Sequence, residues 1–372
     1  MALQPLPDYP WDAMAPYAAR AREHADGIAD LSIGSPVDAT PDVVRDALAA
    51  ATDAHAYPTT TGTPALREAI VEWFSRRRGV PGLTVDQVLP SIGSKELVAF
   101  LPFMVGIGAG DTIVHPLAAY PTYAIGAAIA GADAVASDDP ADWPESTKLV
   151  WLNSPGNPDG RVLSVDELRR AVERARELGA IIVDDECYAE LGWADGWDST
   201  PIPSILDPRV TAGDTTRILA IYSLSKQSNM AGYRAAFAAG CADTIARLLN
   251  VRKHAGLMLP GPLQAAMIAA LGDDEHVAEQ KLLYRSRREM LLPALEAAGF
   301  RVDHSEAGLY LWATEGRDAW ASIGRLADLG ILAGPGTFYG DGYPQHVRLS
   351  LTATDERIAS AAARLRGSRA EG

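Results

Sequence analysis

The chain has 372 residues, of which 48% are hydrophobic and 22% are charged, a composition typical of a globular protein. Its formal net charge of −15 argues against nucleic acid or an anionic membrane surface as a partner. The two cysteines, Cys187 and Cys241, are too few for a disulfide framework. We find neither a signal peptide nor an unbroken apolar stretch of membrane-spanning length, so we expect a cytoplasmic protein.

The predicted elements alternate between helices and strands after an irregular, proline-rich arm that occupies the first 30 residues. Helices are expected at residues 42–51, 64–78, 95–105, 123–130 and 164–178, and strands at 111–115, 132–137, 148–153, 180–186 and 217–224. Ser164 and Glu167 have the spacing of a capping box at the start of a helix. The last two strands are apolar without alternation, as expected for strands covered on both faces. The pattern predicts an α/β fold with a mostly parallel sheet flanked by helices.

The C-terminal third has a different character. Helices are expected at residues 243–253, 262–271, 276–298, 318–329 and 354–365, and short strands at 300–304, 308–313 and 346–352. This arrangement indicates a smaller α+β domain, and the chain length also favours more than one domain. We predict a large domain of residues 41–285, and a small domain formed by the N-terminal arm, residues 1–40, together with residues 286–372.

The strongest chemical signal is Lys226, in the segment SLSK at residues 223–226, with Arg234 eight residues later. The lysine follows an apolar strand directly, and ligands of open α/β sheets bind at the carboxyl ends of the strands. Serine hydroxyls and an arginine are suitable phosphate ligands. A lysine amine among them could form a Schiff base. A lone lysine at such a place is more often a solvated loop residue.

Three further motifs have an ordinary interpretation when each is taken alone. The segment DDECY (184–188) puts carboxylates after an apolar strand, where they need a partner or form a helix cap. The segment NSPGNPDG (153–160) could be a plain turn. The segment SIGSK (91–95) precedes a helix whose free N–H groups could bind an anion. No histidines or cysteines have metal-ligand spacing, and we predict no metal.

Taken together, the order and spacing of these motifs resemble the fold type I pyridoxal-phosphate enzymes, and specifically the class I/II aminotransferases. The resemblance covers nearly the whole chain and includes the segment RLS at residues 348–350. Ser154 and Asp159 depart from the family pattern N-P-x-N-P-x-G. The resemblance implies pyridoxal 5′-phosphate (PLP) as the cofactor, amino acids and 2-oxo acids as substrates, and the family's division into a large and a small domain.

The resemblance also implies roles for individual residues around the cofactor ring. Lys226 would hold the cofactor covalently and move the proton between the substrate's α-carbon and the cofactor. Asp185 would pair with the pyridinium nitrogen and keep the ring protonated, which makes it a better electron sink. Tyr188 and Asn157 would bind the 3′ oxygen of the ring. Tyr120 is expected to stack on the ring, with Tyr123 as the alternative.

Further implied roles concern the phosphate, the substrate and a second subunit. The expected phosphate ligands are Ser223, Ser225, Arg234 and the N–H groups of Ser94 and Lys95. Arg348 would clamp the substrate α-carboxylate, and Gly34 and Asn157 would line the substrate site. Tyr57 resembles the family tyrosine that reaches the phosphate of the neighbouring subunit, which implies a homodimer with shared active sites. Tyr57 could also be a core or interface residue.

Finer similarities point to one subgroup. The segments SKELVAFLP, YPTYAIGA, LSKQSNMAGYR, VRKHAGLMLPGP and DHSEAGLYLWAT resemble actinobacterial N-succinyldiaminopimelate aminotransferases. This similarity implies amino transfer between N-succinyl-LL-diaminopimelate and 2-oxoglutarate in lysine and diaminopimelate biosynthesis. Arg252, Lys253 and His254 form a basic cluster that could bind the substrate tail, or could be a solvated helix end. The arm at residues 9–17 could close over the substrate.

Other classes share these motifs. An aminotransferase for aspartate, aromatic residues or alanine is the nearest alternative. A carbon–sulfur β-lyase would have the same fold and motifs, but it would release pyruvate from cystathionine without 2-oxoglutarate. A non-catalytic ligand sensor on this fold would usually carry a DNA-binding module, and the segment before residue 40 is neither long nor basic enough for one.

Overall fold

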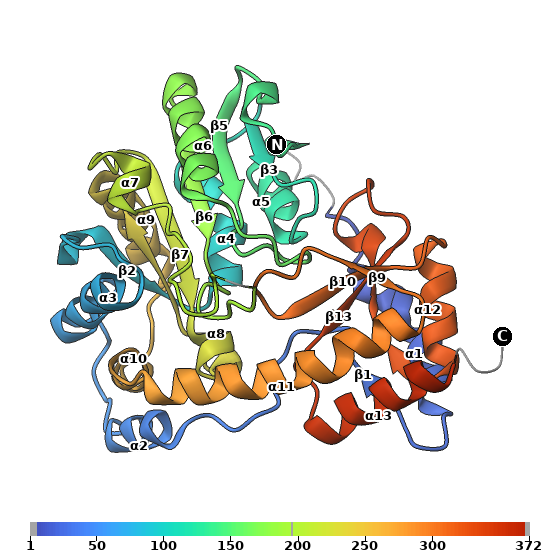
Figure 1. Ribbon diagram of the computed structural model, residues 1–372. Coiled ribbons are helices and arrows are strands. Elements are labelled where there is room, and N and C mark those ends of the chain that lie inside the picture. Colours follow the sequence, from blue (N-terminus) through green and yellow to red (C-terminus); the bar gives the residue numbers. More distant parts are fainter. Residues whose placement is uncertain (1–5, 195, 369–372) are drawn as a thin grey trace.

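A seven-stranded sheet organises the larger part of the molecule (Figure 1). The computed structural model describes residues 6–194 and 196–368. The sheet has the order β2-β8-β7-β6-β5-β3-β4, and its strands are β2 (Val88–Ser91), β3 (Thr112–His115), β4 (Asp133–Ala136), β5 (Thr147–Leu152), β6 (Ile181–Asp185), β7 (Ile218–Ser223) and β8 (Ala236–Gly240). Strands β3 to β7 pair in parallel, and β8 is antiparallel to both of its neighbours. The predicted α/β class with a mostly parallel sheet is confirmed.

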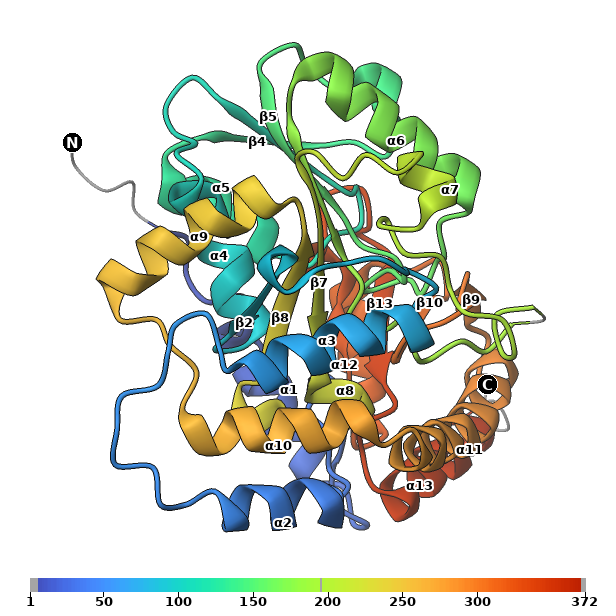
Figure 2. The ribbon, with the colours of Figure 1, turned by 90° about the vertical axis from the view of Figure 1, so that its left-hand side faces the viewer.

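Helices cover both faces of this sheet, as Figure 2 shows. On one face α4 (Ser94–Met104), α5 (Thr122–Ala130) and α9 (Ala242–Ala255) pack over a core that includes Trp151 and Ile221. On the other face α3 (Pro64–Arg77), α6 (Val165–Leu178) and α10 (Gly261–Gly272) pack over a core that includes Val150 and Tyr222. Because side chains alternate along a strand, neighbouring apolar residues enter different cores. This double coverage explains why the strands show no polar alternation.

The capping box predicted at Ser164 and Glu167 is present at the start of α6. The Ser164 Oγ accepts a hydrogen bond from the Glu167 N–H at 3.2 Å, and the Glu167 carboxylate accepts one from the Ser164 N–H at 2.8 Å. The helix α6 then ends at Gly179, which has φ +64. This reciprocal cap satisfies two amide groups that would otherwise lack partners at the helix start.

A second, antiparallel sheet has the order β12-β13-β10-β9. Its strands are β12 (Gly334–Pro335), β13 (His346–Ser350), β10 (Tyr310–Thr314) and β9 (Arg301–Asp303), and beside it β1 (Ala29–Asp30) pairs in parallel with β11 (Ile331–Leu332). Around them lie α1 (Ala15–Arg22), α11 (Glu275–Ala297), α12 (Ala319–Asp328) and α13 (Asp355–Gly367). The N-terminal Leu31 shares a hydrophobic core with Leu311 and Leu349. The proposed domain limits remain a prediction, because α11 runs without interruption across residue 285 and residues 1–5 and 369–372 lie outside the described residues.

Short helices complete the chain. They are α2 (Asp42–Ala50), α7 (Pro208–Thr211), α8 (Leu224–Gln227) and the 3-10 helices η1 (Pro10–Met14), η2 (Val85–Gln87), η3 (Pro140–Asp142), η4 (Ala231–Tyr233) and η5 (Gly336–Phe338). Within the described ranges, no helix is both long and apolar enough to cross a membrane, and no His, Cys, Asp or Glu side chains gather in a group of three or more that could hold a metal ion.

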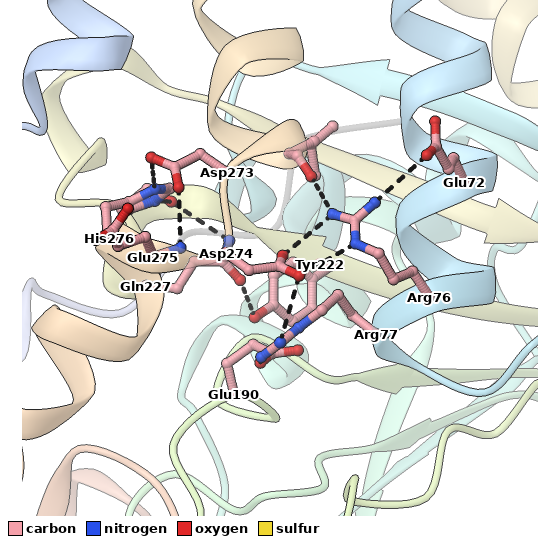
Figure 3. A network of polar contacts seen from close by, with 12 residues as sticks. Glu72, Arg76, Arg77, Glu190, Tyr222, Gln227, Asp273, Asp274, Glu275 and His276 are labelled. Carbon is pink, nitrogen blue, oxygen red and sulfur yellow. Dashed lines mark hydrogen bonds and ion pairs between the residues drawn. The ribbon is translucent and has the colours of Figure 1, made fainter.

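A polar network fixes the base of α8 (Figure 3). The Arg76 guanidinium at the end of α3 forms an ion pair with Asp274 at 3.1 Å, just before α11. The Tyr222 hydroxyl at the end of β7 donates to the Gln227 side-chain oxygen of α8 at 2.6 Å. His276 Nε2 lies 2.8 Å from the hydroxyl of Ser228, which follows α8. These contacts join α3, β7 and α11 beneath the short helix that carries Lys226.

Candidate active site

A cavity of about 670 Å³ opens where β6 and β7 end, and the small sheet closes its other side. Its volume is typical of a small-molecule site. All of the predicted site residues but one line it, namely Gly34, Ser94, Lys95, Tyr120, Asn157, Asp185, Tyr188, Ser223, Ser225, Lys226, Arg234 and Arg348. The exception is Tyr57, whose side chain is 93% exposed and does not line the cavity.

Lys226 enters the cavity from α8, immediately after the end of β7. The Ser223 Oγ accepts a hydrogen bond from the Ser225 N–H at 3.2 Å and caps this short helix. The Lys226 amine donates a hydrogen bond to the carbonyl oxygen of Gly34. Burial lowers the pKa of Lys226 below its usual value, because removal from water disfavours the charged ammonium. An amine that loses its proton more easily is a better nucleophile toward an aldehyde.

Asp185 lies at the end of β6, at the bottom of the cavity. Its carboxylate accepts hydrogen bonds from the Tyr123 hydroxyl at 3.0 Å and from the Cys187 N–H at 3.3 Å. Burial raises the pKa of Asp185 above its usual value. Both donors are neutral, so a positively charged ring nitrogen against this carboxylate would compensate for its burial. This donor set fits the protonated pyridine ring of PLP.

The other end of the cavity has the features of an anion site. Ser94 and Lys95 begin α4, where backbone N–H groups lack partners within the helix. Gly93, just before them, has φ +95, and a Cβ there would lie 2.2 Å from a terminal nitrogen of Arg234. Arg234 can therefore approach the helix start only because residue 93 has no side chain. An arginine beside a helix N-terminus and two serine hydroxyls fits the phosphate group of PLP.

Arg348 reaches the cavity from β13 and is buried. Its two terminal nitrogens donate to the Asn157 side-chain oxygen at 3.0 Å and to the Ser32 carbonyl at 2.7 Å, whereas its Nε has no partner among the described residues. The guanidinium lies between two rings, 3.9 Å from the ring centre of Tyr310 and 4.8 Å from that of Tyr339. A buried arginine held in this way fits a small carboxylate ligand.

The two alternatives for the stacking ring occupy different positions. Tyr120 lines the cavity, and burial raises its pKa to about 12. Tyr123 is fully buried behind it, stacks on Trp151 with ring centres 5.1 Å apart, and donates its hydroxyl to Asp185. This arrangement supports Tyr120 as the residue that faces the cofactor ring and indicates that Tyr123 orients Asp185 instead.

Some cavity residues were not anticipated from the sequence. These are Tyr310 in β10 and Phe338 in η5, which come from the C-terminal part. Tyr9 and Trp11 also line the cavity, and they belong to the arm that was expected to close over the substrate. Trp11 packs on Phe338 with ring centres 5.0 Å apart. The sequence signal at Tyr310 was only that of a short apolar strand. Its place in the cavity depends on packing between segments about 300 residues apart.

The structure separates the members of the basic cluster, for which tail binding and a solvated helix end were the two interpretations: Lys253 and His254 are exposed, as at a solvated helix end, and Arg252 is not. The Arg252 side chain is buried and donates to the Glu96 carboxylate at 2.9 Å. Neither Lys253 nor His254 lines the cavity. A cation at the end of an amphipathic helix can turn either to solvent or to a neighbouring carboxylate, and here Glu96 of α4 decides the direction of Arg252.

The fold and the cavity define a PLP-dependent enzyme with an open α/β sheet. The sequence model described as aminotransferase class I and II matches residues 26–365, and the chain belongs to that family. Its members transfer amino groups between amino acids and oxo acids and depend on PLP. The predicted aminotransferase activity and cofactor are therefore confirmed at this level.

Relatives of the chain include several named aminotransferases. It is 56% identical to the 4-dedimethylamino-4-oxo-anhydrotetracycline transaminase OxyQ of Streptomyces rimosus, over 98% of this chain and 100% of that protein. It is 53% identical to the probable aminotransferase Rv1178 of Mycobacterium tuberculosis, over 97% of this chain and 85% of that protein. A solved structure of a probable N-succinyldiaminopimelate aminotransferase from Thermus thermophilus is 28% identical, with a TM-score of 0.86, over 96% of this chain and 99% of that one.

Proposed function

We propose that the protein transfers an amino group between N-succinyl-LL-diaminopimelate and 2-oxoglutarate, as a cytoplasmic homodimer in lysine and diaminopimelate biosynthesis. The observation that carries the proposal is the placement of charge in the cavity. The half-buried Lys226 and the buried Arg348 line the cavity, and the side chain of Lys95 lies at the start of α4, with its ammonium 5.7 Å from the ring centre of Tyr9 in the arm. Arg348 would bind the α-carboxylate and Lys95 a distal carboxylate.

The residues of this chain would divide the work as follows. PLP, when bound, supplies the electron sink that weakens the bonds at the substrate's α-carbon. Asp185 holds a proton on the ring nitrogen of the cofactor. Lys226 moves the proton at the α-carbon of the substrate, which Arg348 orients by its carboxylate. Tyr188 and Asn157 bind the 3′ oxygen of the ring, and Asn157 also fixes the guanidinium of Arg348.

The phosphate would be held at the far side of the ring by the start of α4, the serines of α8 and Arg234. Because Ser223 caps α8, the same short helix that presents Lys226 also presents Ser225 to the phosphate. Anchoring the phosphate and the ring nitrogen separately would fix the orientation of the cofactor in the cavity that Lys226 also lines. This two-point attachment supports the assignment of Lys226 as the cofactor lysine.

A specific observation favours a second substrate class. The mouth of the cavity is lined by Pro7, Tyr9 and Trp11 of the arm and by Phe338, and such a surface suits an extended, planar ketone. OxyQ, by its name, acts on a tetracycline-type ketone. A polycyclic ketone acceptor is therefore the alternative to a succinylated amino acid.

An amino-donor and acceptor panel tests the proposal. The holoenzyme is assayed with N-succinyl-LL-diaminopimelate and 2-oxoglutarate, and kcat/KM is compared with that for LL-diaminopimelate, aspartate, phenylalanine and alanine, and for glutamate with an anhydrotetracycline-type ketone. Preference for the succinylated donor supports the proposal, and preference for another partner replaces it. Pyruvate release from cystathionine without 2-oxoglutarate would indicate a β-lyase.

A pair of lysine variants tests the distal site. Lys95→Met should raise KM for the succinylated donor more than for glutamate, since its ammonium would no longer meet the distal carboxylate. Lys148→Met is the matched control, because Lys148 is exposed and lies outside the cavity. Equal effects of Lys95→Met on both donors would remove Lys95 from tail binding.

The shared site of a homodimer has a separate test. Tyr57 is exposed on a long connection between α2 and α3, which suits contact with a second subunit. Mixed dimers of Lys226→Ala and Tyr57→Phe subunits should regain one intact site and show more activity than either parent. Activity of the mixture equal to the parents' average would contradict a shared site.

A further inference from the structure

Tyr310 is a buried phenol in the cavity that none of the roles above uses. It comes from β10, where its backbone pairs with Ser350 in β13, two residues from Arg348. Only 5% of its surface is exposed. Its hydroxyl lies 3.3 Å from the hydroxyl of Tyr188. The phenol is therefore held by the small sheet and points toward the residues at the ends of β6 and β7.

The Tyr310 oxygen and the Lys226 amine meet at the same residue, Gly34. A Cβ on Gly34 would lie 2.1 Å from the Tyr310 oxygen, so this oxygen occupies the space of the missing side chain. The Lys226 amine donates to the carbonyl of Gly34. The absence of a side chain at residue 34 thus lets a phenol from β10 and an amine from α8 approach one peptide unit.

The electrostatic surroundings favour the ionised phenol. The titratable and charged groups facing it are Tyr188, Cys187, Lys226, Arg348, Tyr284, Tyr339 and Tyr120. Burial alone would raise the pKa of Tyr310, but the positive charges of Arg348 and Lys226 outweigh it and lower that pKa below its usual value. The guanidinium of Arg348 sits 3.9 Å from the ring centre, and a cation over a ring face favours electron density in the ring.

We propose that Tyr310 is a further acid–base group of this site, whose phenol oxygen exchanges a proton with the amine of Lys226. In this step an N–H bond of the Lys226 ammonium breaks, its electron pair stays on nitrogen, and an O–H bond forms on the Tyr310 phenolate. The amine becomes free without releasing its proton to solvent. The inference rests on the proposed role of Lys226 as the cofactor lysine.

Tyr188 completes the arrangement. Burial raises the pKa of Tyr188 well above its usual value, so Tyr188 keeps its proton, and its hydroxyl lies 3.3 Å from the Tyr310 oxygen. Of the two paired phenols, Tyr188 therefore stays neutral and Tyr310 is the one that exchanges a proton. The Lys226–Tyr310 pair is complementary, because the phenolate partly offsets the effect of burial and raises the pKa of the Lys226 amine.

The test compares the wild type with Tyr310→Phe as full-length proteins freed of cofactor. Covalent attachment of PLP to Lys226 is followed against pH by borohydride trapping and peptide mapping. Loss of the phenolate removes a charge that favours the ammonium, so the midpoint of the profile should move to lower pH. Because Tyr310→Phe also lacks the group that accepts the ammonium proton, attachment at pH values below that midpoint should become several-fold slower. A profile that superimposes on that of the wild type overturns the proposal.

Ultraviolet difference titration gives a readout that needs no cofactor. The wild type should form one tyrosinate below the usual range of about 10, and Tyr310→Phe should lose it. Tyr339→Phe is the matched control and should retain it, since Tyr339 is also buried beside Arg348 but burial raises its pKa. Absence of an early tyrosinate in the wild type overturns the proposal even if Tyr310→Phe fails to fold. PLP attached to a different lysine would instead contradict the proposed function.

Discussion

Gly93→Ala tests the phosphate end of the cavity and separates backbone strain from a specific contact. Gly93 has φ +95 and ψ 148, a conformation almost confined to glycine that costs other residues about 1–3 kcal/mol. The new methyl group would also lie 2.2 Å from a terminal nitrogen of Arg234 and 2.7 Å from its Cζ. The guanidinium is the far end of a flexible side chain and can move, so the contact should displace Arg234 and not unfold the protein.

The expected loss of affinity follows from that displacement. A hydrogen bond to a charged group contributes about 1.5–3 kcal/mol, which corresponds to about tenfold to hundredfold in Kd. Pyridoxamine 5′-phosphate is the suitable ligand, because it has no aldehyde for Lys226 and reports the non-covalent contacts alone. Its Kd for Gly93→Ala is measured by fluorescence titration, and the free energy of unfolding is measured in urea.

Gly82→Ala is the matched control for this experiment. Gly82 also has a positive φ, +85, but a Cβ there would meet no atom within 4 Å. Both variants should lose stability through backbone strain, and only Gly93→Ala should lose affinity for the ligand. Wild-type affinity in Gly93→Ala, or an equal loss of affinity in Gly82→Ala, would refute the assignment of Gly93 and Arg234 to the phosphate site.

Four further outcomes are expected. Lys226→Ala should abolish turnover and leave no borohydride-trapped PLP at residue 226 by mass spectrometry, and normal turnover would exclude its proposed role. Arg348→Ala should reduce kcat/KM for α-carboxylate donors about tenfold to hundredfold, whereas an unchanged value would remove it from the substrate site. The buried guanidinium of Arg78 lies 2.9 Å from the Glu186 carboxylate. Glu186→Gln removes this anionic partner and should lower the free energy of unfolding in urea by about 3–5 kcal/mol; an unchanged free energy of unfolding would contradict this estimate. Hydrogen bonds from Arg301 in β9 lower the pKa of Asp303 to about 2. The contribution of the Asp303 carboxylate to the free energy of unfolding is therefore fully present above the usual carboxyl pKa and is lost as the pH falls through 2. Asp303→Asn should therefore cost about 1 kcal/mol at pH 7 and only a small fraction of that near pH 2, where the carboxyl is half protonated in the folded state, and an equal cost at both pH values would disprove the linkage.

The parallel core of the sheet was predictable because its strands are apolar on both faces and end at polar motifs. Strands β2 and β8 were missed. Small residues dominate β8, and β2 contains Pro90, so neither segment shows the branched apolar pattern on which the prediction depended. Their strand conformation comes from pairing with each other and from the pairing of β8 with β7. The two-residue strands β1, β11 and β12 likewise have too little sequence to carry a local signal.

The site residues likewise fall into those with a local sequence signal and those without one. Lys226 and Asp185 were predictable because each directly follows a buried parallel strand, and parallel strands present their carboxyl ends at one edge. Tyr310 carried no such signal, since aromatic residues on short strands are usual in cores. The direction of Arg252 was also undetermined by its own sequence neighbourhood, because the Glu96 that pairs with it lies on another helix.

The sequence by itself determined the parallel strands β3 to β7 with the helices α5 and α6 between them, the family, and the residues that meet at the edge of the large sheet, because these depend on local patterns and on motifs of fixed spacing. Only the tertiary structure decided which residues of the N-terminal arm and the small sheet complete the cavity. The meeting of Gly34, Tyr310 and Lys226 depends on close packing between three distant segments, and close packing depends on the shapes of all the side chains around it and not on any local pattern.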